Sequence, residues 1–345
     1  MPWRATKNPY YIWISEIILQ QTRVEQGTAY YFRFLRLFPK IEDLAFSSEQ
    51  NVLNAWQGLG YYSRARNLHA TARAIVMEKG GKFPSTYNEL IRLKGVGPYT
   101  AAAISSIAFG EPQPAIDGNV IRVLSRLFEI DKNAQSAAGK RELNAAALAL
   151  MDTTDPGIHN QAMMELGSLV CTPRNPQCSV CPVSLKCGSF HKGTQMDFPP
   201  AKKKTTVRER FFQYFIRTDG EYIVVRHRKA GDIWEGLYDF PMKETTKEAD
   251  AGKAKLDLRL THLLSHQKLK VSFWIDFGKK HRLAQGEKKI LLSQIDQYPM
   301  PQLLIIYLRQ SRYFSGKSLP LGDQKSTDVI ERKQGTTHRK SRARS

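Results

Sequence analysis

The stretch LIRLKGVGPYTAAAI, residues 90–104, joins two helix-forming segments through a turn made of Gly95, Val96 and Gly97. Two glycines around one apolar residue allow a tight turn whose backbone N–H groups are not covered by side chains. With the N-terminus of the next helix, these groups can hold a phosphate oxygen. Alternatively, the turn is only a helix cap followed by a helix that starts with proline, and it binds no phosphate. Helices on both sides, and Leu93 before the turn, favour a helix-hairpin-helix that contacts nucleic acid.

Helical segments extend outward from this turn in both directions. Apolar residues recur at helical spacing, with Gly and Pro between the segments, from residue 9 to about residue 170. The segments are PYYIWISEIILQQTRVEQ (9–26), NVLNAWQGLG (51–60), RNLHATARAIVMEKGG (66–81), TAAAISSIAFG (100–110), NVIRVLSRLFEI (119–130), KRELNAAALALMD (140–152) and NQAMMELGSLV (160–170). We therefore expect an all-α domain over residues 1–194.

All the cysteines of the chain lie in one loop, CTPRNPQCSVCPVSLKC, residues 171–187. Six, two and five residues separate Cys171, Cys178, Cys181 and Cys187 in turn. Structural zinc sites usually combine two short cysteine pairs set well apart, whereas this loop has a single short pair between two outlying thiols. The spacing favours a 4Fe-4S cluster that staples the loop. A zinc ion and unligated thiols are the alternatives that the spacing leaves open.

Beyond residue 194 the composition changes. Residues 195–206 contain two prolines and a run of lysines, which is typical of a linker. Three runs rich in β-branched and aromatic residues predict strands: RFFQYFIRT (210–218), YIVVRHR (222–228) and KVSFWIDF (270–277). An Ala/Lys-rich stretch near 246–256 predicts one helix. We expect an α+β domain over 207–315 and a disordered basic tail over 316–345.

The chain is strongly basic, with a formal net charge of +20 over 345 residues. Such an excess favours a polyanionic partner, nucleic acid first and an anionic membrane second, because each Lys or Arg placed against a phosphate releases counterions. No run of about 18 apolar residues occurs, and the first residues do not resemble a signal peptide. We therefore expect neither a membrane span nor a secreted protein.

Two carboxylates are candidates for catalysis. Glu16 lies in YYIWISEIILQQT, where almost every neighbour is apolar, so its helix is expected to be buried. A carboxyl group there either turns to a solvated edge or lies in a pocket that raises its pKa. Asp117 precedes an apolar helix and on its own is most simply an N-cap. One protonated and one ionised carboxyl group are nevertheless what cleavage of a glycosidic bond requires.

Together these residues resemble the MutY-type adenine DNA glycosylases of the endonuclease III superfamily. The resemblance is carried by WISEIILQQTRV, WQGLGYYSRARNL, LKGVGPYTA, PAIDGNV, HNQAMMELGSLVC and the cysteine spacing. It covers residues 2–190 and weakens across the second domain. It implies a base-excision enzyme with an all-α helix-hairpin-helix domain, a 4Fe-4S cluster on the four cysteines, and a following α+β Nudix-like domain.

The resemblance also implies roles for single residues at the reaction centre. Glu16 matches the glutamate that protonates adenine at N7 and helps to position water. Asp117 matches the aspartate that stabilises the sugar cation. Asn119 matches a helper at the same site, and Tyr99 matches a tyrosine found beside the catalytic pair.

Other positions match residues that hold and open the DNA. The adenine pocket is matched by Trp3, Arg4 and Gln161. An extruded base leaves a hole in the stack that a flat or apolar side chain must fill. The residues expected to do this, or to contact the backbone, are Gln21, Thr22, Leu59, Tyr61, Gly95 and Gly97. Ordinary core packing is the alternative for the aromatic ones.

Tyr99 separates this family from its nearest relatives. Glycosylases that also cut the backbone carry a lysine two residues after the Gly-Val-Gly turn, where it forms a Schiff base with the sugar. Tyr99 occupies that position, and Lys94 lies before the turn. We therefore expect a monofunctional glycosylase that leaves an abasic site. A bifunctional glycosylase/lyase for oxidised pyrimidines and a noncatalytic iron-sulfur DNA sensor are the alternatives.

The second domain matches the family in two short elements. DIWEGLYDFP (232–241) fits its W-x-x-L-Y-x-FP element, and HLLSH (262–266) fits the turn that recognises 8-oxoguanine, which implies Ser265 and His266. Leu264 stands where the family usually has Phe. There is no Arg-Glu-x-x-Glu-Glu box, so nucleotide pyrophosphatase activity is not expected, and a plain folding module is the alternative.

The expected partner is double-stranded DNA with adenine opposite 8-oxoguanine or guanine. We expect a monomer that binds no membrane and works in a bacterial cytoplasm at the nucleoid.

Overall fold

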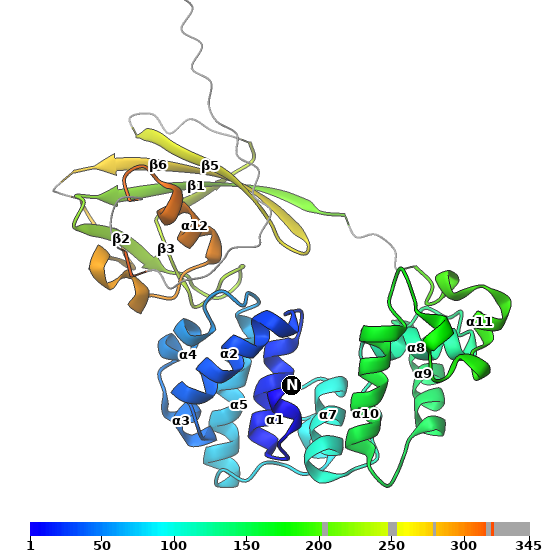
Figure 1. Cartoon of the computed structure of the whole chain (residues 1–345). Helices are drawn as coiled ribbons and strands as arrows, with labels where there is room; N and C mark the ends of the chain where they lie inside the picture. The colour runs from blue at the N-terminus through cyan, green and yellow to red at the C-terminus, as the bar shows by residue number, and fades with distance from the viewer. Residues whose placement is uncertain (202–205, 248–253, 279–280, 315–318, 321–345) are drawn as a thin grey trace, which may run out of the picture. The chain divides into compact units, whose positions relative to one another are not determined.

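The computed structural model describes residues 1–201, 206–247, 254–278, 281–314 and 319–320. The chain divides into two compact units (Figure 1). The first comprises Met1–Ser47 and Arg64–Lys204, and the second comprises Ser48–Ser63 and Thr205–Ser345. Most of the predicted basic tail over 316–345, and the lysine run of the predicted linker, lie outside the described residues.

The first unit is all-α over its described residues, as the sequence predicted. Its α-helices are α1 (Pro9–Leu19), α2 (Val24–Leu37), α3 (Ile41–Phe46), α5 (Ser63–Lys79), α6 (Tyr87–Leu90), α7 (Pro98–Phe109), α8 (Gly118–Phe128), α9 (Ala137–Leu150), α10 (Pro156–Glu165) and α11 (Gly188–Lys192). Short turns complete it: the 3₁₀ turns η1 (Pro2–Arg4), η3 (Cys178–Val180), η4 (Ser184–Lys186) and η5 (Gln195–Asp197), and the π-helical η2 (Leu166–Val170).

Helix α1 lies in the interior of this unit. Asn8 caps its N-terminus by accepting hydrogen bonds from two backbone N–H groups, and Pro9 follows at the first helical position, where it needs no N–H partner. The helix packs against α2 and α7, and its residues 12–18 are all buried. Its side chains are apolar around most of its circumference, so Glu16 is carried into an apolar interior.

The predicted helix over 9–26 is interrupted between α1 and α2. Gln21 has φ +59°, a left-handed conformation that ends the helix. Arg64 of α5 donates its Nη1 hydrogens to the carbonyls of Ile17, Ile18 and Gln20 at 2.8, 3.1 and 2.6 Å. One arginine therefore satisfies carbonyl groups that every helix leaves open at its C-terminus.

Over its described residues, the second unit is built on a seven-stranded mixed sheet with the main order β3-β2-β1-β6-β5. Its strands are β1 (Arg208–Thr218), β2 (Tyr222–His227), β3 (Tyr238–Asp239), β4 (Met242–Thr245), β5 (Lys255–Leu263), β6 (Gln267–Phe277) and β7 (Glu287–Leu291). The central strands β1 and β6 run parallel, from Arg208 opposite Gln267 to Thr218 opposite Phe277, and the other pairs are antiparallel. The 3₁₀ turn η6 (Leu292–Gln297) and helix α12 (Gln302–Gln310) follow.

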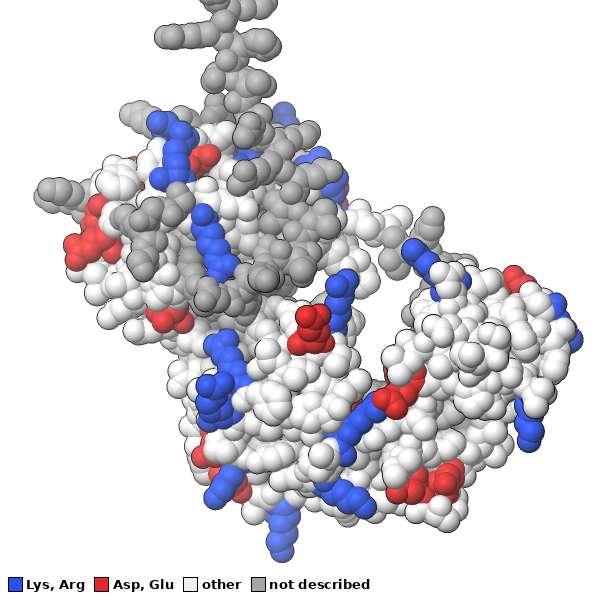
Figure 2. All heavy atoms as spheres, in the orientation of Figure 1, with Lys and Arg blue, Asp and Glu red and all other residues white. Residues whose placement is uncertain are grey.

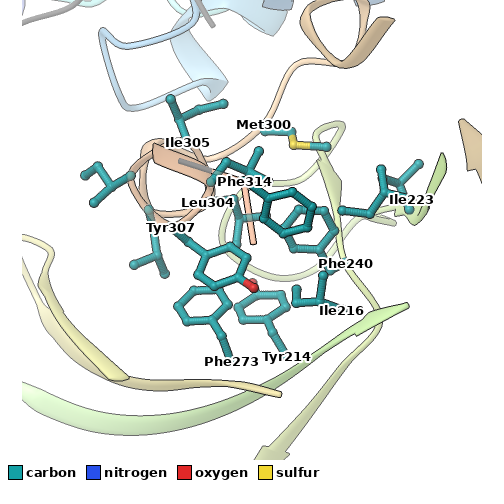
Figure 3. Close-up of a cluster of buried hydrophobic side chains, with 14 of the residues drawn as sticks. Tyr214, Ile216, Ile223, Phe240, Phe273, Met300, Leu304, Ile305, Tyr307 and Phe314 are labelled. Atoms are coloured by element: carbon teal, nitrogen blue, oxygen red, sulfur yellow. The ribbon is translucent and has the colours of Figure 1, made fainter. Parts of the chain in front are cut away.

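An aromatic stack fills the core between the sheet and α12 (Figure 3). The rings of Tyr214 and Phe273 lie side by side on neighbouring strands, with centroids 5.4 Å apart and planes within 11° of parallel, and the ring of Tyr307 stacks on Phe273 with centroids 4.0 Å apart and planes within 8° of parallel. Offset parallel rings at this separation add to the stability that burial alone provides. These ring contacts connect β1, β6 and α12.

The prediction of a helix near 246–256 is wrong where the structure describes those residues. Residues 248–253 lie outside the described residues, and Lys255 begins strand β5. The sequence analysis missed α12, whose central run LLIIYL is apolar at every position. A helix buried all round shows no helical periodicity, so its pattern cannot be told from that of a buried strand.

Residues 48–63, predicted as part of the helical domain, group with the second unit. Helix α4 (Glu49–Trp56) belongs to this segment. Side-chain amides of Gln50 and Asn54 donate to the carbonyl of Gln297 at 2.7 and 2.9 Å. The Tyr62 hydroxyl donates to the carbonyl of Met300 at 3.3 Å. These hydrogen bonds between positions far apart in the chain could not be inferred from local sequence patterns.

Basic side chains are scattered over the visible face of the helical unit, with fewer acidic ones between them (Figure 2). The net charge is therefore not concentrated in one patch on that face. Within the described part of the chain, no helix is both long enough and apolar enough to cross a membrane.

Candidate active site

Glu16 occupies the centre of the site, and its carboxyl group is buried, with the residue only 8% exposed. Burial raises its pKa from 4.5 to about 7, since desolvation penalises the charged form. A hydrogen bond with Tyr99 and the positive charge of Arg4 act in the opposite direction, and the negative charge of Asp117 adds to the rise. Near neutral pH this carboxyl group therefore still holds a proton in a large fraction of molecules.

Asp117 is both an N-cap and a candidate for catalysis. Its Oδ1 accepts hydrogen bonds from the backbone N–H groups of Asn119 and Val120, both at 2.8 Å, at the start of α8. Its Oδ2 accepts a hydrogen bond from the Asn119 side chain at 2.8 Å. These three hydrogen bonds hold the Asp117 carboxyl group in place at the N-terminus of α8. The N-cap interpretation and the catalytic one are thus compatible in this geometry.

Asn119 links Asp117 to a buried arginine. Its Oδ1 accepts a hydrogen bond from Arg122 Nη2 at 2.9 Å, and Arg122 also donates to the carbonyls of Gly167 and Cys171 at 2.5 and 2.6 Å. A Cβ atom on Gly167 would lie 2.6 Å from Asn119 Cβ, so only glycine fits there. The orientation of the Asp117 carboxylate is therefore fixed by contacts that continue to Cys171.

Tyr99 lies beside Glu16, near the start of α7. Its hydroxyl has one hydrogen, which it can donate either to Met164 Sδ, 3.2 Å away, or to the ionised Glu16 carboxylate, whose pKa that hydrogen bond lowers. Burial and the neighbouring Glu16 raise the pKa of Tyr99 far above its usual value. The phenol therefore stays neutral, and it acts on Glu16 through hydrogen bonding rather than through a negative charge.

The three predicted pocket residues come from the two ends of the helical unit. Trp3 is buried, and its ring meets Tyr31 of α2 edge-on with centroids 5.4 Å apart. Arg4 forms an ion pair with Glu165 at the end of α10. Gln161 lies half-buried on the same helix, one turn before Glu165 and so on the same face. Arg4 is connected to Glu16 electrostatically; no direct contact of Gln161 with Glu16 is recorded among the described residues.

The predicted hairpin is a tight turn that leads into α7. Gly95 has φ +78°, and a Cβ atom there would lie 2.6 Å from Asn67 Cβ. Gly97 caps α7 in an extended conformation and has open space where a Cβ would be. Thr71 Oγ1 fixes the turn by donating to the Lys94 carbonyl at 2.7 Å. The start of α7 can therefore approach a phosphate closely.

Two of the residues predicted to enter the base stack share a conformational feature. Gln21 and Tyr61 are exposed non-glycine residues with φ +59° and +46°. Such strain persists only where the surroundings impose it, and it is common at functional sites. Leu59, in contrast, is buried, at 8% exposed. The Oγ1 atom of Thr22 is buried and has no hydrogen-bond partner in the described structure.

The predicted lesion-reading turn is a tight hairpin of the second unit. Leu264 and Gln267 pair through backbone hydrogen bonds of 2.8 and 3.4 Å, which leaves Ser265 and His266 exposed at the tip between β5 and β6. The Ser265 hydroxyl is hydrogen-bonded to that of Tyr61. The structure thus brings together two residues predicted for separate DNA contacts.

The four cysteines line a single pocket, and none forms a disulfide. Val123, Leu127 and Val170 are among the apolar residues around it. No three His, Cys, Asp or Glu side chains of the described residues are close enough to hold a single metal ion. Four cysteines around one pocket are the ligand set of a 4Fe-4S cluster.

The surroundings of this pocket also fit an anionic cluster. Arg126 is 3% exposed, and in the described structure its hydrogen-bond acceptors are backbone carbonyls and Cys171 Sγ, which lies 3.3 Å from Nη1. A buried guanidinium needs a counter-charge. Thiolates holding a 4Fe-4S cluster would supply it, whereas neutral thiols would not.

The sequence analysis did not single out several residues that shape the site. They are Arg64, Arg122, Arg126, Met164 and Glu165. Arginines in amphipathic helices usually lie on the solvated face, so their burial depends on tertiary contacts that a single sequence does not show. Glu165 follows Gln161 by four residues, a spacing that places both side chains on the same face of a helix. This spacing was the one feature of the sequence from which a place for Glu165 near the predicted pocket could have been inferred.

Three family models match the chain. The model of HhH-GPD superfamily base excision DNA repair proteins matches residues 14–147. The model of the iron-sulfur binding domain of endonuclease III matches residues 171–184, and that of the NUDIX domain matches residues 213–310. The predicted order of a helix-hairpin-helix domain, a 4Fe-4S loop and a Nudix-like domain is thereby confirmed.

Proteins of known activity resemble the chain over most of its length. The adenine DNA glycosylase of Buchnera aphidicola subsp. Baizongia pistaciae is 34% identical over 309 residues, which cover 84% of this chain and 85% of the relative. The adenine DNA glycosylase of Mus musculus is 44% identical over 201 residues, 56% of this chain and 39% of the relative. A solved thermostable thymine-DNA glycosylase is 30% identical, with a TM-score of 0.52 over 56% of this chain and 88% of that one.

Proposed function

The chain belongs to the adenine DNA glycosylase family, and from this premise we propose that it removes adenine mispaired with 8-oxoguanine, or more slowly with guanine. It hydrolyses the N-glycosidic bond without cutting the backbone, and so leaves an abasic site. The single observation that carries this proposal is the buried Glu16 carboxyl group, whose pKa is raised to about 7. A general acid works best when its pKa is close to the working pH.

The two carboxyl groups divide the chemistry between them. Glu16, kept protonated by burial, can transfer its proton to a ring nitrogen of adenine and make the base a better leaving group. Asp117 accepts three hydrogen bonds that hold its carboxylate in place at the start of α8. Its negative charge can stabilise the oxocarbenium-like sugar left when the bond breaks. After the base has left, the Glu16 carboxylate can orient a water molecule for attack on the sugar.

The surroundings of Glu16 support a monofunctional reaction. The groups that act electrostatically on its carboxyl are those of Tyr99, Asp117 and Arg4, and none of these is an amine nucleophile. Lys94 is exposed and precedes the Gly-Val-Gly turn, whereas Tyr99 follows it. A Schiff base with the sugar needs an uncharged amine at the reacting carbon, so we do not expect lyase activity.

Binding of the duplex is assigned to both units. The hairpin around Gly95 and Gly97 would hold the backbone, and the exposed turn with Ser265 and His266 would contact 8-oxoguanine. A 4Fe-4S cluster, when bound, supplies a covalent staple for the loop 171–187. The enzyme is proposed to act as a monomer at the nucleoid of a bacterial cytoplasm, in keeping with its net charge of +20.

Strand breakage tests the proposal. In a single turnover, a duplex with one adenine opposite 8-oxoguanine should break at the adenine only after alkali treatment. A duplex with thymine glycol opposite adenine should stay intact. Breakage without alkali, or only of the oxidised pyrimidine, would show a lyase instead. Binding without any base release would indicate a noncatalytic sensor.

A further inference from the structure

Two consecutive residues at the end of α10 contact the two groups that lower the pKa of Glu16. Met164 Sδ accepts the hydrogen bond of Tyr99, and Glu165 is ion-paired with Arg4. Consecutive helical residues point about 100° apart, so Met164 and Glu165 reach two different groups near Glu16. The π-helical turn η2 follows directly at Leu166, and such turns are frequent at functional sites.

Arg4 depends on this contact for its position. It ends η1, a 3₁₀ turn of three residues whose backbone is fixed mainly by the burial of Trp3. An arginine side chain carries several rotatable bonds and loses considerable entropy when it is held in one place. In the structure its Nη1 is paired with Glu165 Oε1, across 161 positions of sequence. Among the described residues, Glu165 is the one hydrogen-bond partner of this guanidinium, so its other N–H groups can face a base.

Three titratable groups act on the Glu16 carboxyl, and each comes from a different element. They are Arg4 from η1, Tyr99 from α7 and Asp117 from the N-terminus of α8. Helix α2 also packs on α1, but among the described residues none of its groups acts on Glu16. Glu165 does not act on Glu16 directly either. Any influence of Glu165 must therefore pass through Arg4.

We propose that Glu165 is a positioning residue: its carboxylate holds the Arg4 guanidinium beside Glu16, so that the ion pair, rather than Arg4 alone, completes the adenine pocket. This inference rests on the proposed function. Glu165 then fixes the position of Arg4, and the charge of Arg4 in turn affects the pH range in which Glu16 keeps its proton. When Arg4 is released, its positive charge moves away from Glu16, and the protonated form of Glu16 becomes more stable.

The test is the pH dependence of single-turnover adenine release for wild type, Arg4→Gln, Glu165→Gln and the double variant. Both single variants should slow release by about 10- to 100-fold, as expected when a positioned group is lost. In both, the decline of the rate at high pH should move to higher pH. The double variant should be no worse than the worse single variant, because each change breaks the same pair.

Two further variants complete the test. Glu165→Asp keeps the charge and should restore much of the rate and the wild-type pH dependence. Glu142→Gln breaks an ion pair of similar exposure with Lys132 in the same unit and should change neither property. The inference would be overturned if the decline of the rate at high pH in Glu165→Gln stayed at the wild-type pH or moved to lower pH. It would also be overturned if the effects of Arg4→Gln and Glu165→Gln added up in the double variant. Absence of adenine release by the wild type would instead reject the proposed function.

Discussion

Replacing Glu16 by Gln should make the protein more stable at alkaline pH while abolishing base release. In the unfolded chain this carboxyl group ionises with a pKa near 4.5, whereas burial holds the folded pKa at about 7. The folded state therefore binds the proton more tightly. The contribution of the protonated Glu16 carboxyl group to the free energy of unfolding is fully present below pH 4.5 and is lost as the pH rises through 7. Each pKa unit is worth about 1.4 kcal/mol, so the loss approaches about 3 kcal/mol.

Glutamine has the same shape and no charge, so Glu16→Gln avoids this loss. The variant and the wild type should have similar free energies of unfolding near pH 4.5, and the variant should be more stable by about 3 kcal/mol near pH 8. Urea unfolding followed by far-ultraviolet circular dichroism, which reports chiefly the helical unit, measures the difference. Glu142→Gln serves as the exposed control and should show no such pH dependence. An equal difference at both pH values would refute the assignment of a buried, protonated Glu16.

Three further substitutions test the surroundings of Glu16. Asp117→Asn should keep the N-cap while slowing base release by about 100-fold or more, and Asp117→Ala should in addition cost about 1 kcal/mol in a thermal unfolding experiment. Tyr99→Phe removes a hydrogen bond that lowers the Glu16 pKa. In a pH–rate profile, the decline of the rate at high pH should therefore move to higher pH. A decline at the wild-type pH would show that this hydrogen bond has no role. Gly167→Ala places a Cβ atom 2.6 Å from Asn119 Cβ and should reduce both stability and single-turnover rate, whereas an unchanged rate would show that Asn119 does not orient Asp117.

Local patterns in the sequence were sufficient for much of the helical unit. Apolar periodicity located most of its helices, and the cysteine spacing indicated a cluster loop that the family comparison supports. Glu16 could be singled out because a carboxylate among apolar neighbours is unusual at any helical position. Asp117 was recognisable as a cap from its place before an apolar helix, and the structure gives it that role.

What the sequence did not indicate depends on contacts between distant positions. The grouping of residues 48–63 with the second unit rests on hydrogen bonds to Gln297 and Met300. The pairing of Arg4 with Glu165 likewise joins the two ends of the helical unit. Helix α12 was missed for a different reason, because its apolar run lacks the alternation from which a helix is inferred.

The most direct test of the account is to measure free adenine. A duplex with one adenine opposite 8-oxoguanine is incubated with an excess of enzyme near neutral pH, and the released base is identified and counted. The account predicts one adenine per duplex with the wild type. It predicts almost none with Glu16→Gln, although that variant should still bind the duplex. Release of adenine by Glu16→Gln at the wild-type rate, or release of another base by the wild type, would contradict it.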